Sequence, residues 1–217
     1  MRKTLIWDLP TRLFHWLLVL CIAGAWITGE KGAFDWHMRF GYGVLGLVLF
    51  RILWGLIGSD TARFIQFVRG PAAILHHIRE LRAPGRLAPH AGHNALGALA
   101  VLGLLLVVGM QAVSGLFTSD GIMTDGPLVE HVSGATASLM RTIHLNNFNI
   151  LLAIAGLHIV AILVYALWKR LDLVRPMVTG WVTLPASHPA PRIVSLVRAL
   201  VVAAISATTI WALVSFA

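Results

Sequence analysis

The chain has 217 residues, of which 58% are hydrophobic and only 12% are charged. This balance excludes a disordered protein and lies far from the roughly 45–50% apolar and roughly 25% charged composition of soluble domains. The net charge of +8 is, taken alone, typical of a nucleic-acid-binding protein. The single cysteine, Cys21, excludes an internal disulfide, a four-cysteine metal site and the Cys-x-x-Cys-His attachment of a c-type haem.

Five apolar stretches are long enough, or nearly so, to cross a membrane as helices. They are residues 13–28, 37–57, 95–117, 144–168 and 199–217. The first stretch does not resemble a secretory signal, because it ends in Trp26-Ile27-Thr28-Gly29-Glu30 and lacks a small-residue cleavage site. We therefore expect an all-α integral membrane protein with a four-helix bundle and a fifth, C-terminal transmembrane helix.

The connecting segments predict an orientation. Arginine and lysine gather at the amino terminus and in the segments 58–92 and 169–198, which the positive-inside rule assigns to the cytoplasm. The segments 29–36 and 118–142 are acidic and are expected outside. The sequence thus predicts a multi-pass membrane protein with a cytoplasmic N-terminus and a C-terminus on the outer side. The excess of basic residues then reflects topology, and no nucleic acid partner is expected.

The chain divides into three expected parts. Residues 1–180 form the core, residues 181–198 form a cytoplasmic linker that contains Pro185, Pro189 and Pro191, and residues 199–217 form the last helix. Within the core, residues 71–81 have the apolar spacing of an amphipathic helix that lies in the membrane interface.

Histidines within the expected spans are the most informative residues, because ionisable side chains in a membrane are costly and mark functional sites. His144 and His158 are separated by fourteen residues. That spacing places them about 21 Å apart along a helix and within about 40° of the same face. His37 matches the depth of His144 near the outer side, and His15 matches His158 near the inner side.

Paired imidazoles at two depths suit two non-covalent b-type haems, each with bis-histidine iron. The alternative for any single membrane histidine is a hydrogen-bonding role without a ligand. A structural zinc site is disfavoured, because its four ligands converge on one point and often include thiolates.

Four arginines lie near the expected ligands and are candidates to bind haem propionates. Arg12, Arg39 and Arg141 stand two or three residues from a histidine, although snorkelling to the interface explains them equally well. Arg51 follows His37 by fourteen residues and is expected within the membrane.

The remaining histidines have less specific roles. His93, with His90, is expected to contact a propionate, to relay protons to a quinone or to anchor a helix at the headgroups. We expect solvated or interfacial positions for His76, His77, His131 and His188.

Several short motifs together resemble the bacterial cytochrome b561 family, over roughly residues 5 to 180. They are Trp7-Asp8-x-Pro10-Thr11-Arg12-x-x-His15-Trp16, His37 with Arg51 through Trp54-Gly55, Gly92-His93-Asn94, and His144 with His158. More narrowly, the chain is similar to the b-type cytochrome subunit of nickel–iron hydrogenases. The resemblance implies a four-helix diheme core with His15, His37, His144 and His158 as iron ligands.

These expectations favour a diheme cytochrome b of an electron-transport or respiratory chain. It would pass electrons between a quinone or quinol and a periplasmic redox partner such as a c-type cytochrome, which acidic outer segments suit. One alternative is superoxide:quinone oxidoreductase-like activity, which a positive outer surface would favour. Others are a membrane anchor for a hydrogenase-type or dehydrogenase-type complex, and a transporter, although no paired repeats are evident.

Overall fold

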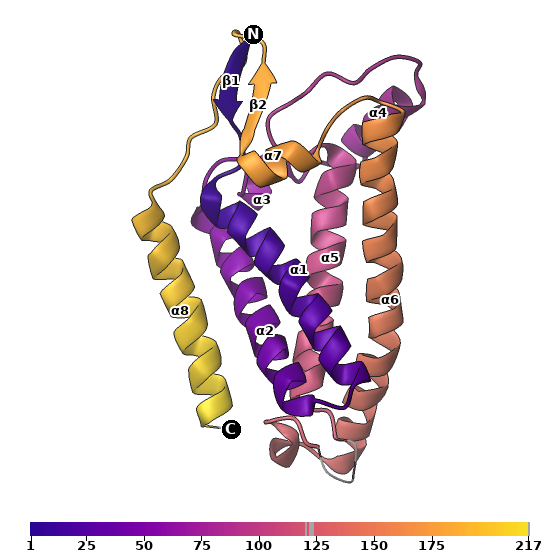
Figure 1. Cartoon of the computed structure of the whole chain (residues 1–217), viewed down its shortest axis with the longest axis vertical. Coiled ribbons are helices and arrows are strands. Elements are labelled where there is room, and N and C mark those ends of the chain that lie inside the picture. The colour runs from indigo at the N-terminus through magenta and orange to yellow at the C-terminus, as the bar shows by residue number, and fades with distance from the viewer. Residues whose placement is uncertain (120, 122–123, 217) are drawn as a thin grey trace. The chain divides into compact units, whose positions relative to one another are not determined.

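The computed structural model describes residues 1–119, 121 and 124–216. Its described part contains five helices that are long and apolar enough to cross a membrane. They are α1 (Leu9–Glu30), α2 (Phe34–Ile57), α5 (Ala95–Leu116), α6 (Gly134–Leu167) and α8 (Leu196–Ser215) (Figure 1). The chain is thus an all-α integral membrane protein, as predicted. Asp120, an acid of the segment 118–142 that we expected outside, and Ala217, the predicted end of the last span, lie outside the described residues.

The fourth span begins earlier than predicted. We placed residues 118–142 in a loop, but α6 starts at Gly134. Ser133 caps this first turn, since its Oγ accepts a hydrogen bond from the backbone N–H of Thr136 at 3.2 Å. The first turns of α6 are polar, so a search for apolar runs misses them. Arg141 consequently lies on the helix and not in a loop.

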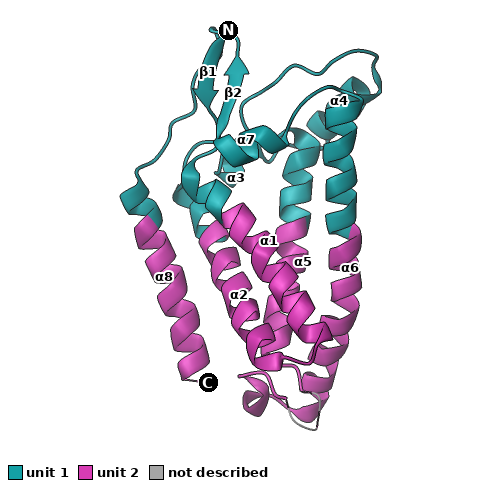
Figure 2. Ribbon diagram, viewed as in Figure 1, with its two compact units in different colours: residues 1–13, 52–103, 154–199 teal, residues 14–51, 104–153, 200–217 magenta. Residues whose placement is uncertain are grey.

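The chain forms two compact units (Figure 2). Unit 1 consists of Met1–Leu13, Ile52–Gly103 and Ile154–Ala199, and unit 2 of Phe14–Arg51, Leu104–Ala153 and Leu200–Ala217. Each long helix contributes residues to both. Unit 1 also contains β1 (Arg2–Leu5), α3 (Phe64–Phe67), α4 (Pro71–Arg82), α7 (Val174–Thr179) and β2 (Trp181–Leu184), and unit 2 contains the 3₁₀ helix η1 (Val129–His131). The amphipathic helix predicted at 71–81 is confirmed as α4.

A short antiparallel ladder in unit 1 was not predicted. β1 pairs with β2 in a register that runs from Arg2 opposite Leu184 to Leu5 opposite Trp181. The next two backbone N–H groups, of Ile6 and Trp7, both donate to the carbonyl of Gly180. Gly180 has a φ of 88°, a conformation that favours glycine. The first four residues of the expected linker therefore form a strand.

Asp8 is the N-cap of α1 and is only 1% exposed. One carboxylate oxygen accepts the backbone N–H of Thr11 at 2.8 Å, and the other accepts Nε1–H of the fully buried Trp54 at 3.0 Å. The cap thus also holds the end of α2. This double role explains why a carboxylate is buried here.

The segment before α8 is tied to the residues that follow α2 within unit 1. The backbone N–H of Arg192 donates to Asp60 Oδ2 at 2.8 Å, and that of Val194 donates to Ser59 Oγ at 3.0 Å. Within unit 2, Ile210 of α8 forms a buried cluster with Leu45 of α2 and Leu116 of α5. The fifth long helix is therefore packed against other elements at both of its ends.

Candidate functional site

His37 of α2 and His144 of α6 lie close together in unit 2. Their ring centroids are 6.1 Å apart and their planes are inclined at 78°. The two residues are separated by more than a hundred positions in the chain, so the fold brings them together as the matched depths predicted.

Each of these imidazoles is held through its Nδ1 atom by a backbone carbonyl of another helix. His37 Nδ1 lies 2.8 Å from the carbonyl oxygen of Ala25 on α1, and His144 Nδ1 lies 2.9 Å from that of Gln111 on α5. A carbonyl oxygen only accepts, so Nδ1 carries the hydrogen in both rings. The lone pair is therefore left on Nε2, which is the arrangement of a metal-ligating histidine oriented by its second nitrogen.

A glycine lies one turn beyond each of the two carbonyls. Gly29 follows Ala25 by four residues, and Gly115 follows Gln111 by four residues, so each glycine shares the face of its carbonyl. A Cβ at Gly29 would lie 2.9 Å from His37 Nδ1, and a Cβ at Gly115 would lie 3.0 Å from His144 Cε1. Both helices thus offer the same cradle, in which a carbonyl holds the ring and a glycine makes room for it.

Side-chain amides further fix the His144 side of the site. Gln111 Nε2 donates to the carbonyl of His144 at 3.0 Å, and Asn147 Nδ2 donates to Gln111 Oε1 at 2.8 Å. Asn147 is 3% exposed and also donates to the carbonyl of Val107. These bonds join α5 to α6 at the level of the ligand candidate and limit the movement of its ring.

The distance between the two rings is compatible with one iron atom held between two imidazoles. Two metal–nitrogen bonds of about 2 Å each, together with the radii of two imidazole rings, span about 6 Å between ring centres. The observed separation of 6.1 Å agrees with this value. Neutral imidazoles on both sides suit a b-type haem iron. In the described part of the chain, no group of three or more His, Cys, Asp or Glu residues is arranged to hold a metal ion.

The second predicted pair is divided between the two units. His15 lies on α1 in unit 2, where its ring meets that of Trp16 edge-on at 4.9 Å. His158 lies half-buried on α6 in unit 1. α6 runs without interruption over Gly134–Leu167, so the predicted fourteen-residue spacing of His144 and His158 falls on one helix.

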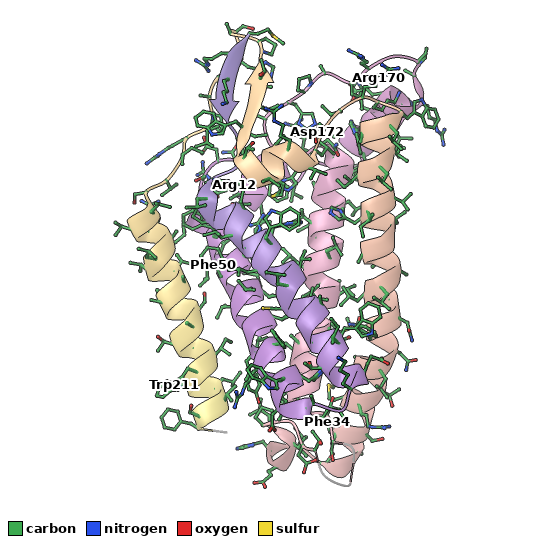
Figure 3. All side chains as sticks on the ribbon, in the orientation of Figure 1. Arg12, Phe34, Phe50, Arg170, Asp172 and Trp211 are labelled. Carbon is green, nitrogen blue, oxygen red and sulfur yellow. The ribbon has the colours of Figure 1, made fainter. Side chains whose placement is uncertain are left out.

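The candidate arginines occupy different environments. Arg51 is 2% exposed on α2. Arg12, at the start of α1, donates from Nη1 to the carbonyl of Val178 on α7 at 2.6 Å (Figure 3). Arg39 is exposed and lies 5.0 Å from the ring centroid of Trp36, and Arg141 is exposed on α6. Exposure of the last two fits snorkelling as well as propionate binding.

His93 and His90 lie in unit 1, just before α5. His93 is placed between two aromatic rings, with centroid distances of 4.6 Å to Trp7 and 4.5 Å to Phe67. His90 has a buried Nε2 atom without a hydrogen-bond partner among the described residues. Burial lowers the pKa of His90, so its ring is neutral at pH 7.

His77 contradicts our prediction of a solvated or interfacial histidine. It is 7% exposed, and its Nε2 lies 2.7 Å from the hydroxyl oxygen of Tyr165 while its Nδ1 lies 3.0 Å from Glu80 Oε2. The amphipathic pattern of α4 indicated which face is apolar, but it did not indicate that a polar partner on α6 lies opposite that face. His76, His131 and His188 are exposed, as predicted.

Comparison with known proteins identifies a family for the chain. The family model described as prokaryotic cytochrome b561 matches residues 6–180. No curated protein and no solved structure matches the chain. The matched range contains all four candidate ligands and ends before α8.

Proposed function

Because the chain belongs to the prokaryotic cytochrome b561 family, we propose that it carries electrons across the bilayer between a quinone or quinol and a redox protein on the outer side. The family establishes a membrane b-type cytochrome that takes part in electron transfer. The observation that carries the finer proposal is the His37–His144 pair, whose Nε2 atoms are left to bind iron.

Two haems complete the proposal. His37 and His144 hold the outer haem, and His15 and His158 hold the inner one. A bound haem supplies iron that cycles between two oxidation states by one electron. The chain's own contribution is to fix the tautomer and the orientation of each ligand and to keep water from the iron. Arg12, Arg39, Arg51, Arg141 and His93 are the proposed partners of the propionates.

The orientation follows from the distribution of charge. We place the protein in the bacterial inner membrane, with the N-terminus and the end that contains α4 in the cytoplasm and the C-terminus in the periplasm. Residues 1–180 form the electron-transfer core, residues 181–198 the linker and residues 199–217 an additional span. The family match over residues 6–180 supports residue 180 as the end of the electron-transfer core.

The charge of the proposed outer face supports a basic protein partner. The described acids there are exposed and outnumber the exposed bases; the acids are Glu30, Asp35, Asp125 and Glu130, and the bases are Lys31, Arg39 and Arg141. A positively charged c-type cytochrome is attracted to such a surface, whereas the superoxide anion is not. In a second form of the same proposal, the chain is the b-type subunit of a hydrogenase-like complex. A larger redox subunit then occupies this face.

The test uses the purified haem-loaded protein in liposomes. A short-chain ubiquinol is expected to reduce the b haems, and an oxidised c-type cytochrome added outside is expected to reoxidise them, with a rate that falls as salt rises. Glu130→Lys should slow reoxidation and leave reduction by quinol unchanged. Haems that no quinol reduces, or that superoxide reduces much faster than quinol does, would contradict the proposal.

A further inference from the structure

A continuous set of polar side chains connects the surface of unit 1 to the buried side of α6. Glu80 of α4 has a side chain that is 45% exposed, and its Oε2 atom contacts Nδ1 of His77 at 3.0 Å. His77 Nε2 lies 2.7 Å from the hydroxyl oxygen of Tyr165, which is 6% exposed. Asn94 Nδ2 donates to the same hydroxyl oxygen at 3.0 Å. Two hydrogen-bonding contacts thus reach from the exposed Glu80 to a buried phenol, and Asn94 makes a third contact to that phenol.

The buried end of this set, Tyr165, lies on the same helix as His158. Tyr165 follows His158 by seven residues on α6, so the two side chains share one face and lie about 10 Å apart along the axis. The phenol therefore stands between the surface of unit 1 and the proposed inner haem ligand, without being next to that ligand.

The contacts also determine which atom donates in each protonation state. An ionised Glu80 only accepts, so Nδ1 of His77 carries a hydrogen. With the ring neutral, Nε2 has a lone pair and accepts the hydroxyl hydrogen of Tyr165. With the ring protonated, Nε2–H donates to the hydroxyl oxygen, which already accepts from Asn94, and the hydrogen of Tyr165 must turn toward another acceptor. Protonation of His77 thus changes the direction in which Tyr165 donates.

We propose that Glu80, His77 and Tyr165 form a relay that moves protons between the aqueous phase beside α4 and the half of the membrane that contains His158. The proposal rests on the proposed quinone chemistry. Oxidation of a quinol to a quinone releases two electrons, which pass to haem b, and two protons. Each proton passes to Tyr165 as its own hydroxyl hydrogen passes to His77 Nε2, and the Nδ1 hydrogen then leaves to Glu80. Glu80 releases that proton to water, and His77 regains its hydrogen on Nδ1 and its lone pair on Nε2 before the next proton passes. Reduction of a quinone reverses every step, so the balance is one proton for each electron.

A purely structural connection between α4 and the end of α6 would not need the Glu80–His77–Tyr165 contacts, because another hydrogen bond already makes that connection. Lys169 is 1% exposed and donates from Nζ to the carbonyl of Ala83, just after α4, at 2.5 Å. Other charged or titratable groups near His77 are His76, His90, Arg69 and Glu80. Of these, only Glu80 hydrogen-bonds to the ring in the described part of the chain.

A first experiment is independent of haem. The chain has two tyrosines, so Tyr42→Phe leaves Tyr165 as the only phenol. In this background, the infrared band of the tyrosine C–O bond should shift as His77 is protonated, and His77→Gln should abolish the shift. His76→Gln is the matched control, because His76 is the exposed neighbour on the same helix, and it should leave the shift intact.

A second experiment follows protons in the haem-loaded protein. In liposomes that contain a pH-sensitive dye, Tyr165→Phe and His77→Gln should slow quinol-driven haem reduction by about tenfold to a hundredfold and should reduce the solvent isotope effect on it. Both variants should retain their haems. Added imidazole should restore the rate in His77→Gly, which a purely structural role would not permit. Glu80→Gln, an exposed change that spares the fold, should slow proton exchange with the medium.

The outcomes separate the two proposals. If quinol does not reduce the wild-type haems, the proposed function fails, and the infrared experiment still decides whether His77 and Tyr165 are coupled. If quinol reduces the haems equally fast in wild type, Tyr165→Phe and His77→Gln, the relay is overturned and the proposed function stands. If the infrared band of Tyr165 does not shift as His77 is titrated, the relay is also overturned.

Discussion

Gly115 lies against the ring of His144, at a distance at which a methyl group would make an unusually tight contact. The ideal Cβ would be 3.0 Å from Cε1 and 3.3 Å from Nδ1 of the imidazole. Since the ring is also held by the carbonyl of Gln111, moving it away from Gly115 would strain that hydrogen bond.

Gly115→Ala should therefore displace the ring and weaken retention of the outer haem. Overpacking of this kind costs about 1–3 kcal/mol, and we expect the purified variant to lose a large part of one haem and to show a shifted ligand-field spectrum for the remainder. Gly103→Ala on the same helix is the control, because nothing lies within 4 Å of its Cβ. Equal haem contents in the two variants would mean that the glycine does not cradle the ligand.

Haem content also tests the pairing of the histidines. Wild type should contain two b haems, and His37→Ala and His144→Ala should each remove the same one, because a ring without its opposite partner does not retain the haem. The double variant should lose no more than either single variant. His158→Ala should remove the other haem, and His131→Ala, at an exposed position on η1, should remove none. Additive losses from His37 and His144 would show that they serve different haems.

Much of this site was predicted from the spacing of residues along single helices, because that spacing can be read directly from the sequence. The shared face of His144 and His158 follows from fourteen residues on one helix, and the five spans follow from their apolar length. The carbonyls of Ala25 and Gln111 were not predictable in the same way. Whether a carbonyl of one helix meets the ring of another depends on the rotation and the height of both helices, which no single helix encodes.

His77 illustrates the same limit on a smaller scale. Its position on α4 was predicted, but its burial depends on Tyr165, which is 88 residues away in the chain. The ladder of β1 and β2 was missed for a related reason, since strands of four residues have little periodicity and their pairing is distant in sequence. The one signal for it in the sequence is Gly180, whose left-handed conformation ends α7 and turns the chain into β2.

Asp8 should contribute strongly to stability. Asp8→Ala leaves two buried donors, the N–H of Thr11 and Nε1–H of Trp54, without an acceptor, and we expect a loss of about 2–4 kcal/mol. Thermal unfolding in detergent measures the effect. In a double-mutant cycle, the loss should be smaller in a Trp54→Phe background, where one of those donors is absent.

Asp172→Ala is the control, because Asp172 (Figure 3) caps the exposed start of α7 through the N–H groups of Val174 and Arg175. Similar losses at Asp8 and Asp172 would contradict the assigned roles.

Acid should loosen the connection between α2 and α8 through Asp60. The backbone N–H of Arg192 is the main cause that holds the pKa of Asp60 below its ordinary value, with Arg63 adding to it. A carboxyl group whose pKa is lowered by folding stabilises the fold at a pH above its ordinary pKa, and this contribution disappears as the pH falls through the lowered value.

The measurement compares the Tm of wild type and Asp60→Asn over a range of pH. The difference should be constant from neutral pH to about pH 5 and should shrink at lower pH, as the wild-type carboxylate becomes protonated. Asp125→Asn, which removes an exposed carboxylate elsewhere, supplies the baseline for the loss of one negative charge. Cleavage after Arg192 by trypsin at neutral pH should also be faster in Asp60→Asn, because that variant holds the backbone of Arg192 less firmly. A Tm difference that does not change with pH would show that the carboxylate charge of Asp60 does not secure the segment before α8.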